Sequence, residues 1–183
     1  MSSTDTGIAV AHEVIERHSF ALLEAARIYH TVWPDPNTRY VDVVAMLNRH
    51  AGYPGFAGLL ARDSTGRAVA MAYGHTTCPG QWWHDRVEPE LPPESAGWLD
   101  DCFLLVELAV LPEYRRRGIA RGLLERLLRS RTEARAALST QEDNEPALAL
   151  YAALGWRPIA GPMRFAPAGT PFVILGRELQ GSW

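Results

Sequence analysis

The stretch FLLVELAVLPEYRRRGIARGLLERLLRSR, residues 103–131, decides the fold of the second half of this chain. Residues 103–110 are almost wholly apolar and predict a buried central strand, which Pro112 ends. Leucines then recur at helical spacing, so residues 118–131 predict an amphipathic helix. Between the strand and the helix lie three consecutive arginines, whose position needs an explanation.

The start of this helix is suited to an anionic group. First-turn N–H groups have no partner within a helix and form the positive end of its dipole. Gly118 and the small Ala120 let an anion approach the backbone, and Arg115, Arg116 and Arg117 add positive charge. The junction lacks both the Gly-Lys-Ser/Thr of a Walker loop and the GxGxxG of a dinucleotide fingerprint. We therefore expect a phosphate cradle of another kind.

Periodicity and turn signals predict the remaining elements. Strands alternate with helices in the second half, which indicates an α/β sheet. The expected elements are helices at 20–33 and 38–50, a hairpin at 54–76 around DSTG, a short strand at 136–140, a helix at 144–155 with Asn144 as N-cap, and a strand at 172–179. Residues 78–100, which hold four prolines and three tryptophans, predict a long irregular loop.

Length and composition restrict the class of protein. A chain of 183 residues, 47% hydrophobic and 21% charged, predicts one soluble globular domain over residues 1–183. The two cysteines and six histidines show no ligand spacing, so we expect no metal and no disulfide. No apolar run is long enough to cross a membrane, and the N-terminus lacks signal-peptide features, so a cytoplasmic location is expected.

Two motifs carry a resemblance to a known family. LAVLPEYRRRGIARGLL resembles the coenzyme A-binding signature of the GNAT N-acetyltransferase superfamily, Arg/Gln-x-x-Gly-x-Gly/Ala after a central strand. Arg115, Gly118 and Ala120 fill its three defined positions. NEPALALYAALGW resembles the family's Asn-x-x-Ala-x-x-Leu-Tyr-x-x-x-Gly-Phe segment, with tryptophan in place of the final phenylalanine. The close match covers residues 103–157, and the N-terminal half fits the family layout only loosely.

The resemblance implies a fold and a co-substrate. The fold is a mixed, mostly antiparallel central sheet of about six to seven strands, flanked by about four helices, with a splayed central strand. The co-substrate is acetyl-CoA, whose pyrophosphate would lie on backbone N–H groups from Arg115 to Ala120, including that of Ile119. The pantetheine arm would hydrogen-bond the central strand at Leu108, Ala109 and Val110. Asn144 would contact the arm or order the following helix.

The resemblance also implies a role for Tyr151, which would point at the thioester sulfur. A thiol has an aqueous pKa of about 8.5 and tyrosine one of about 10, so a tyrosine held close could protonate a departing thiolate. A core aromatic on a helix face is the alternative for Tyr151. The backbone N–H of Leu108 is the candidate donor to the oxyanion that forms during amide formation.

Glu107 is the candidate general base or amine-binding group. It lies inside an otherwise apolar strand, where burial tends to raise the pKa of a carboxyl. The alternatives for Glu107 are that it pairs with an arginine or that this face of the strand is open to water. A chain of water molecules could also deprotonate the amine, or the amine could bind in its neutral form. Ribosomal-protein alanine acetyltransferases carry their glutamate where this chain reads Leu138-Ser139-Thr140. Histone-type members carry theirs where this chain has Leu104. Neither glutamate is present here, so neither substrate class is supported.

The loop at 78–100 is the candidate acceptor-binding segment. Trp82, Trp83 and Trp98 could bound the apolar part of an amine, and the carboxylates between Asp85 and Asp101 could attract its charge. A solvated connection pinned by its tryptophans is the alternative, and His84 is expected at the surface.

These inferences predict an N-acetyltransferase that moves an acetyl group from acetyl-CoA to the primary amine of a small molecule through a ternary complex. A non-catalytic acyl-CoA-binding regulatory module is the alternative; it would keep the cradle and lose Tyr151 or the amine site. A nucleic-acid partner is disfavoured by the formal net charge of -3, despite the clustered arginines. No membrane partner is expected, and a homodimer is compatible with the sequence.

Overall fold

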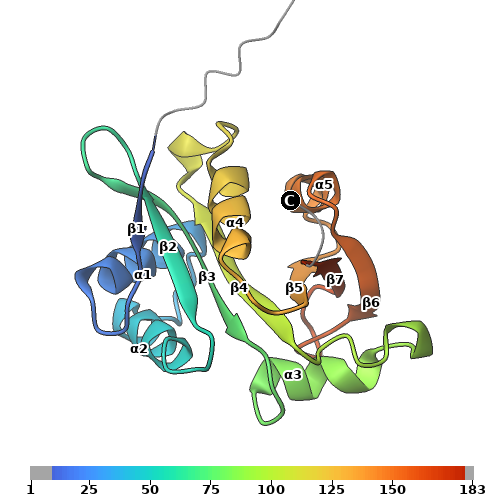
Figure 1. The fold of residues 1–183 in the computed structure, drawn as a ribbon. Helices are drawn as coiled ribbons and strands as arrows, with labels where there is room; N and C mark the ends of the chain where they lie inside the picture. Colours follow the sequence, from blue (N-terminus) through green and yellow to red (C-terminus); the bar gives the residue numbers. More distant parts are fainter. Residues whose placement is uncertain (1–9, 180–183) are drawn as a thin grey trace, which may run out of the picture. The chain divides into compact units, whose positions relative to one another are not determined.

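The structure is a computed structural model that describes residues 10–179. Within this range the strands are β1 (Ala11–Val14), β2 (Ala57–Arg62), β3 (Ala68–Thr76), β4 (Cys102–Val110), β5 (Arg135–Gln141), β6 (Arg157–Met163) and β7 (Phe172–Glu178). The α-helices are α1 (Phe20–Val32), α2 (Tyr40–His50), α3 (Trp82–Val87), α4 (Ile119–Arg129) and α5 (Glu145–Ala153). Figure 1 shows these elements along the chain.

The strands form a seven-stranded sheet in the order β1-β2-β3-β4-β5-β7-β6. The pairs β1–β2, β2–β3, β5–β7 and β6–β7 run antiparallel, whereas β4 and β5 run parallel. The parallel pairing joins only Cys102–Leu104 to Arg135–Ala137, although both strands continue beyond it. The mixed, mostly antiparallel sheet and the short pairing of its central strand confirm the fold that the resemblance implies.

The chain forms two compact units. Unit 1 contains residues up to His75 together with Glu107–Ser130, and unit 2 contains Thr76–Val106 and the residues from Arg131 onward. Strand β4 contributes its first half to unit 2 and its second half to unit 1.

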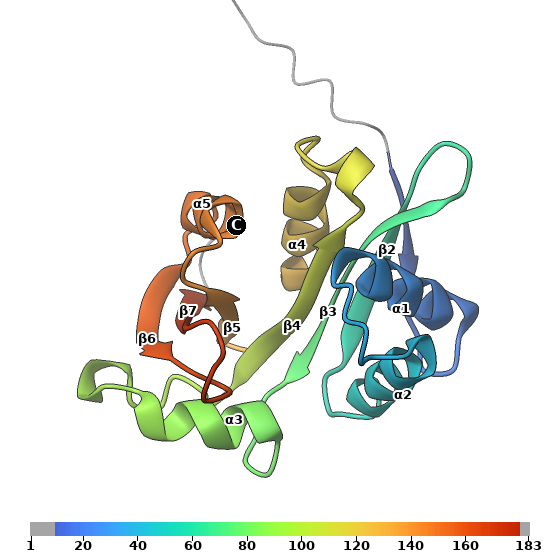
Figure 2. The ribbon, with the colours of Figure 1, turned by 180° about the vertical axis from the view of Figure 1, so that it is seen from behind.

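In unit 1, helices α1 and α2 lie on one face of the strands and α4 lies on the other (Figure 2). Helix α1 begins at Ser19, whose hydroxyl accepts a hydrogen bond from the N–H of Leu22 at 3.0 Å. The β2–β3 hairpin predicted around DSTG is confirmed: Asp63 accepts from the N–H groups of Thr65 and Arg67, and Gly66 turns the chain at φ +86°.

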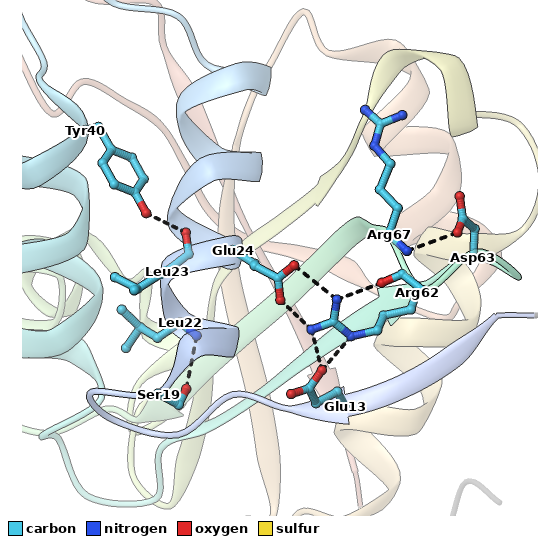
Figure 3. A network of polar contacts seen from close by, with 10 residues as sticks. Glu13, Ser19, Leu22, Leu23, Glu24, Tyr40, Arg62, Asp63 and Arg67 are labelled. Carbon is cyan, nitrogen blue, oxygen red and sulfur yellow. Dashed lines mark hydrogen bonds and ion pairs between the residues drawn. The ribbon is translucent and has the colours of Figure 1, made fainter.

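An arginine ties three elements of unit 1 together (Figure 3). The guanidinium of Arg62 on β2 donates to Glu13 on β1, at 2.5 Å, and to both carboxylate oxygens of Glu24 on α1. The side chains of Arg62 and Glu24 are only 19% and 14% exposed, so this pair is partly removed from solvent. The network fixes α1 against the outer strands.

In unit 2, the sheet packs its core around Trp98. A Cβ at Gly176 on β7 would lie 2.5 Å from the Trp98 ring, so only glycine allows this approach. Helix α5 has the predicted cap: the Asn144 side chain accepts from the N–H of Ala147 at 3.3 Å. No helix within residues 10–179 combines the length and apolarity needed to cross a bilayer.

The structure corrects two expectations about residues 78–100. The segment is largely helical, with α3 followed by 3-10 turns at Glu88–Glu90 and Pro93–Ser95, because Pro89 and Pro93 occupy first-turn positions that tolerate proline. His84, expected at the surface, is only 2% exposed, since it lies with Val87 on the buried side of α3. Its Nδ1 lies 3.4 Å from a carboxylate oxygen of Asp85 and 3.6 Å from one of Glu88.

Candidate functional site

The expected phosphate cradle lies in unit 1, where β4 leads into α4. Gly118 is the N-cap of α4 and has φ +75° and ψ −5°, in the left-handed region that favours glycine. A Cβ at Gly118 would have no heavy atom within 4 Å, so the space beside the helix start is open. Arg116 also has positive φ, 61°, which turns the loop tightly before the helix. An anion could therefore reach the first-turn N–H groups of α4.

The three arginines around this helix start are exposed, but they differ in their contacts. Arg115 folds back, and its Nε donates to the carbonyl oxygen of Val110 at 3.1 Å. The guanidinium of Arg117 lies over the ring of Tyr114, 5.6 Å from its centroid. The Tyr114 hydroxyl in turn donates to Asp63 at 2.7 Å. These contacts hold the positive charges near the helix start without neutralising them.

The end of β4 presents backbone groups to one side. A hydrogen bond from the Leu111 N–H to the Val69 carbonyl, 2.9 Å, joins the end of β4 to β3. Hydrogen-bonding groups alternate in direction along a strand, so the neighbouring Val110 turns its own away from β3. The roles of Leu108, Ala109 and Val110 toward the pantetheine arm stay predictions, and the side chain of Ala109 is buried in the core.

Glu107 lies in the same half of β4 and is half-buried. Burial raises the pKa of its carboxyl from 4.5 to about 8. None of the hydrogen bonds or ion pairs among residues 10–179 involves this carboxyl, so the alternative of an arginine partner finds no support there. At neutral pH the group is mostly protonated, and it becomes a base as the pH approaches 8.

Around Glu107 the structure gathers aromatic and imidazole side chains that no sequence motif indicated. Nδ1 of His50 lies 3.1 Å from the Tyr73 hydroxyl, and the His50 ring lies 5.9 Å from those of Tyr53, Tyr73 and His75. Burial, and then the charges of His75 and Arg49, lower the pKa of His50 to about 4. Burial, and then the charge on Glu107, raise the pKa of Tyr73 on β3 and of Tyr29 on α1.

Unit 2 carries the other residues expected to act. Tyr151 on α5 is 7% exposed, and its ring meets that of Trp156 edge-on with 5.7 Å between centroids. Asn144 caps α5 and so orders this helix, while its contact with the pantetheine arm stays a prediction. The role of Tyr151 as a proton donor stays a prediction.

The three tryptophans occupy different environments. Trp82 is 58% exposed, packs against Phe165 at 5.4 Å between centroids, and lies beneath the Arg86 guanidinium. Trp83 is half-buried and donates to the Ser139 hydroxyl at 3.2 Å. Trp98 is 6% exposed in the core of unit 2. Trp82 is therefore the most accessible of the three to a ligand.

No cluster of three histidine, cysteine, aspartate or glutamate side chains in the described part of the chain is arranged to hold a metal ion.

Comparisons with known proteins agree with this geometry. A model of the Acetyltransferase (GNAT) family matches residues 22–156, which include residues of both units. A GCN5-like protein acetyltransferase of Mycobacterium tuberculosis is 36% identical over 128 residues, which are 65% of this chain and 62% of that protein. The match thus spans less than two thirds of the relative's length.

Solved structures share the fold. The ribosomal-protein-S18-alanine N-acetyltransferase of Escherichia coli superposes with a TM-score of 0.66 at 18% identity, covering 94% of this chain and 97% of that one. The yncA protein of Salmonella typhimurium, solved with its cofactor acetyl-CoA, superposes with a TM-score of 0.65 at 13% identity, covering 96% of each chain. At such identities the likeness concerns the fold alone.

Proposed function

The chain belongs to the GNAT acetyltransferase family, and on this premise we propose that it transfers an acetyl group from acetyl-CoA to a primary amine. The observation that carries the proposal is the helix start at Gly118, where positive φ, open space and flanking arginines coincide on the family's coenzyme A-binding motif. A helix N-terminus of this kind binds phosphate groups without any special side chain.

The described residues fit acetyl-CoA, which when bound would supply the activated acetyl group as a thioester. Backbone N–H groups at the start of α4 would hold the pyrophosphate, with Arg116 and Arg117 adding charge. Backbone groups of Leu108 and Val110 would hold the pantetheine arm. Arg115 already donates to the Val110 carbonyl, but a carbonyl oxygen has two lone pairs and can accept a second bond.

Three groups of the chain are proposed to act on the reacting atoms. Glu107 in unit 1 removes a proton from the acceptor's ammonium group, and its raised pKa, about 8, is close to what a base working near neutral pH needs. The Leu108 N–H stabilises the developing oxyanion. In unit 2, the Tyr151 hydroxyl supplies a proton to the leaving sulfur.

The proposed acceptor is the primary amine of a small molecule. Exposed Trp82 offers an aromatic surface, and the acids of α3 and the following turns attract cations. A protein amine is the second candidate, and the Mycobacterium tuberculosis relative, a GCN5-like protein acetyltransferase, favours it.

A screen tests the proposal and separates the two acceptor classes. Small primary amines and lysine-containing peptides are incubated with acetyl-CoA at pH 8.5, and free thiol is measured as it appears. We expect thiol release to depend on one acceptor class and to fall about 10²- to 10⁴-fold in Glu107→Gln, the range that removal of a general base produces. Tight binding of acetyl-CoA without acceptor-dependent thiol release from either class would indicate a non-catalytic acyl-CoA-binding module instead.

A further inference from the structure

The side chain of Tyr73 is placed to interact with Glu107. Strands β3 and β4 run antiparallel, as shown by the Leu111 N–H to Val69 bond near one end and the Thr77 N–H to Cys102 bond near the other, each 2.9 Å. The two bonds belong to registers that differ by one residue, so an irregularity in the pairing lies between them. Burial, and then the charge of Glu107, raise the pKa of Tyr73, so the two side chains lie close enough to interact.

The Tyr73 hydroxyl nevertheless has its hydrogen bond elsewhere. It lies 3.1 Å from Nδ1 of His50, and no hydrogen bond among residues 10–179 joins it to Glu107. Tyr73 is 1% exposed, so its hydroxyl hydrogen needs a protein partner. A neutral imidazole with its hydrogen on Nε2 leaves Nδ1 as an acceptor, and His50 stays neutral at any pH well above 4.

The direction of this hydrogen bond decides the chemistry of the carboxyl beside it. A hydroxyl that donates to a carboxylate stabilises its charged form and makes it a weaker base. A hydroxyl that donates to His50 presents only lone pairs to the carboxyl and cannot stabilise that charge. Which group accepts from Tyr73 therefore decides how strongly Glu107 holds its proton.

We propose that His50 is a positioning residue, whose Nδ1 accepts the Tyr73 hydroxyl hydrogen and so keeps this donor turned away from Glu107. The carboxyl is left as a strong proton acceptor although a hydroxyl lies beside it. This inference rests on the proposed function of Glu107 and adds the device that tunes it.

The surrounding groups are consistent with this arrangement. The titratable and charged side chains that interact with this group are Tyr29 on α1, Arg49 and His50 on α2, Tyr53 after α2 and His75 on β3, and Asp35 acts on Tyr29. Burial is the one cause that shifts the pKa of Glu107, which is raised to about 8. Ring contacts with Tyr53 and His75, in addition to Tyr73, fix the His50 ring.

The test follows the titration of Glu107 itself and requires no acceptor. The protein is labelled with ¹³C at glutamate side-chain carboxyls, and the Glu107 resonance is assigned by its loss in Glu107→Gln. The pKa of Glu107 is then measured in the wild type, His50→Phe, His50→Asn, Tyr73→Phe and the double variant His50→Phe/Tyr73→Phe, each checked for folding by thermal unfolding.

We expect His50→Phe to lower the pKa of Glu107 by at least one unit, a tenfold loss of proton affinity, because the freed hydroxyl then donates to the carboxylate. His50→Asn, whose amide oxygen can replace Nδ1 as acceptor, should restore most of the wild-type value. Tyr73→Phe and the double variant should both retain the high pKa, since neither has a hydroxyl to donate.

Two results would overturn the inference. One is an unchanged Glu107 titration in His50→Phe. The other is a clear rise of the Glu107 pKa in Tyr73→Phe, which would mean that the hydroxyl already donates to Glu107 in the wild type. Failure of the proposed function looks different: Glu107→Gln would keep its turnover whatever the titrations show.

Discussion

The Glu107 carboxyl is half-buried and has no cationic partner among the described residues, so its titration reports directly on the effect of burial. Its pKa is raised from 4.5 to about 8, so the folded protein binds this proton more tightly than the unfolded chain does. The stability that this gives is fully present below pH 4.5 and is lost as the pH rises toward 8.

We therefore predict that Glu107→Gln reduces the fall in unfolding free energy between pH 5 and pH 8.5. The wild type must place a charge in a half-buried strand at the higher pH, whereas glutamine does not titrate. Urea unfolding at the two pH values measures this. Identical pH slopes for the two proteins would show that the carboxyl titrates normally.

Tyr151 supports a second prediction at the residue scale. Tyr151→Phe removes one hydroxyl and keeps the ring contact with Trp156, so the fold should survive. Turnover should fall about 10²- to 10⁴-fold, the range for a lost general acid, while the affinity for acetyl-CoA stays within twofold or so. Tyr40→Phe, which loses only a hydrogen bond to the Leu23 carbonyl, is the matched control and should keep its turnover. Equal turnover in all three proteins would make Tyr151 a core residue only.

The sequence predicted part of the candidate site at this scale. Gly118, the arginines and Asn144 follow from a strand–helix junction and a capping pattern, which are local and can be read along the chain. The unpartnered state of Glu107 and the cluster of His50, Tyr73 and His75 could not be predicted. Those side chains come from α2, β3 and β4, and only the tertiary fold brings them together.

Among the elements, β1, β2 and α1 are held by the network centred on Arg62 (Figure 3). We predict that Arg62→Ala lowers the unfolding free energy by about 1.5–3 kcal/mol, because Glu13 and Glu24 lose charged hydrogen bonds and are left repelling each other. Arg39→Ala is the control: its pair with Asp42 is far more exposed, 77% and 45%, and its loss should cost under about 1 kcal/mol. Equal losses in the two variants would contradict the role of the network.

The elements that the sequence missed have a common cause. Strands β1 and β6 are the two edges of the sheet, where one side lacks a partner strand and the usual apolar alternation is not required. All four residues of β1 are exposed, and β6 contains Pro158, Gly161 and Pro162, which are tolerated at an edge but read as turn signals. The prolines around α3 likewise read as turn signals, so this helix was not predicted. The central strand β4 and the helices α1, α2, α4 and α5 carried clear periodicity and were predicted.

At the scale of the whole molecule, the family match covers residues of both units, and the proposed functional groups are distributed between them. Unit 1 holds the proposed phosphate cradle, Glu107 and the residues proposed to tune it, and unit 2 holds Tyr151 and the exposed Trp82. The account makes the binding of acetyl-CoA its central claim, because every proposed catalytic role depends on it.

Calorimetry of acetyl-CoA binding to Gly118→Asp, compared with Gly122→Asp, tests that claim most directly. Both glycines lie in or at the start of α4 with open space where a Cβ would go, so the two changes add the same charge to the same helix. Aspartate tolerates positive φ better than most residues, so Gly118→Asp should fold, which thermal unfolding checks. The account predicts that Gly118→Asp weakens binding at least about tenfold, the effect of losing roughly 1.4 kcal/mol, while Gly122→Asp changes it much less. Unchanged affinity in a folded Gly118→Asp protein would place acetyl-CoA elsewhere and contradict the account.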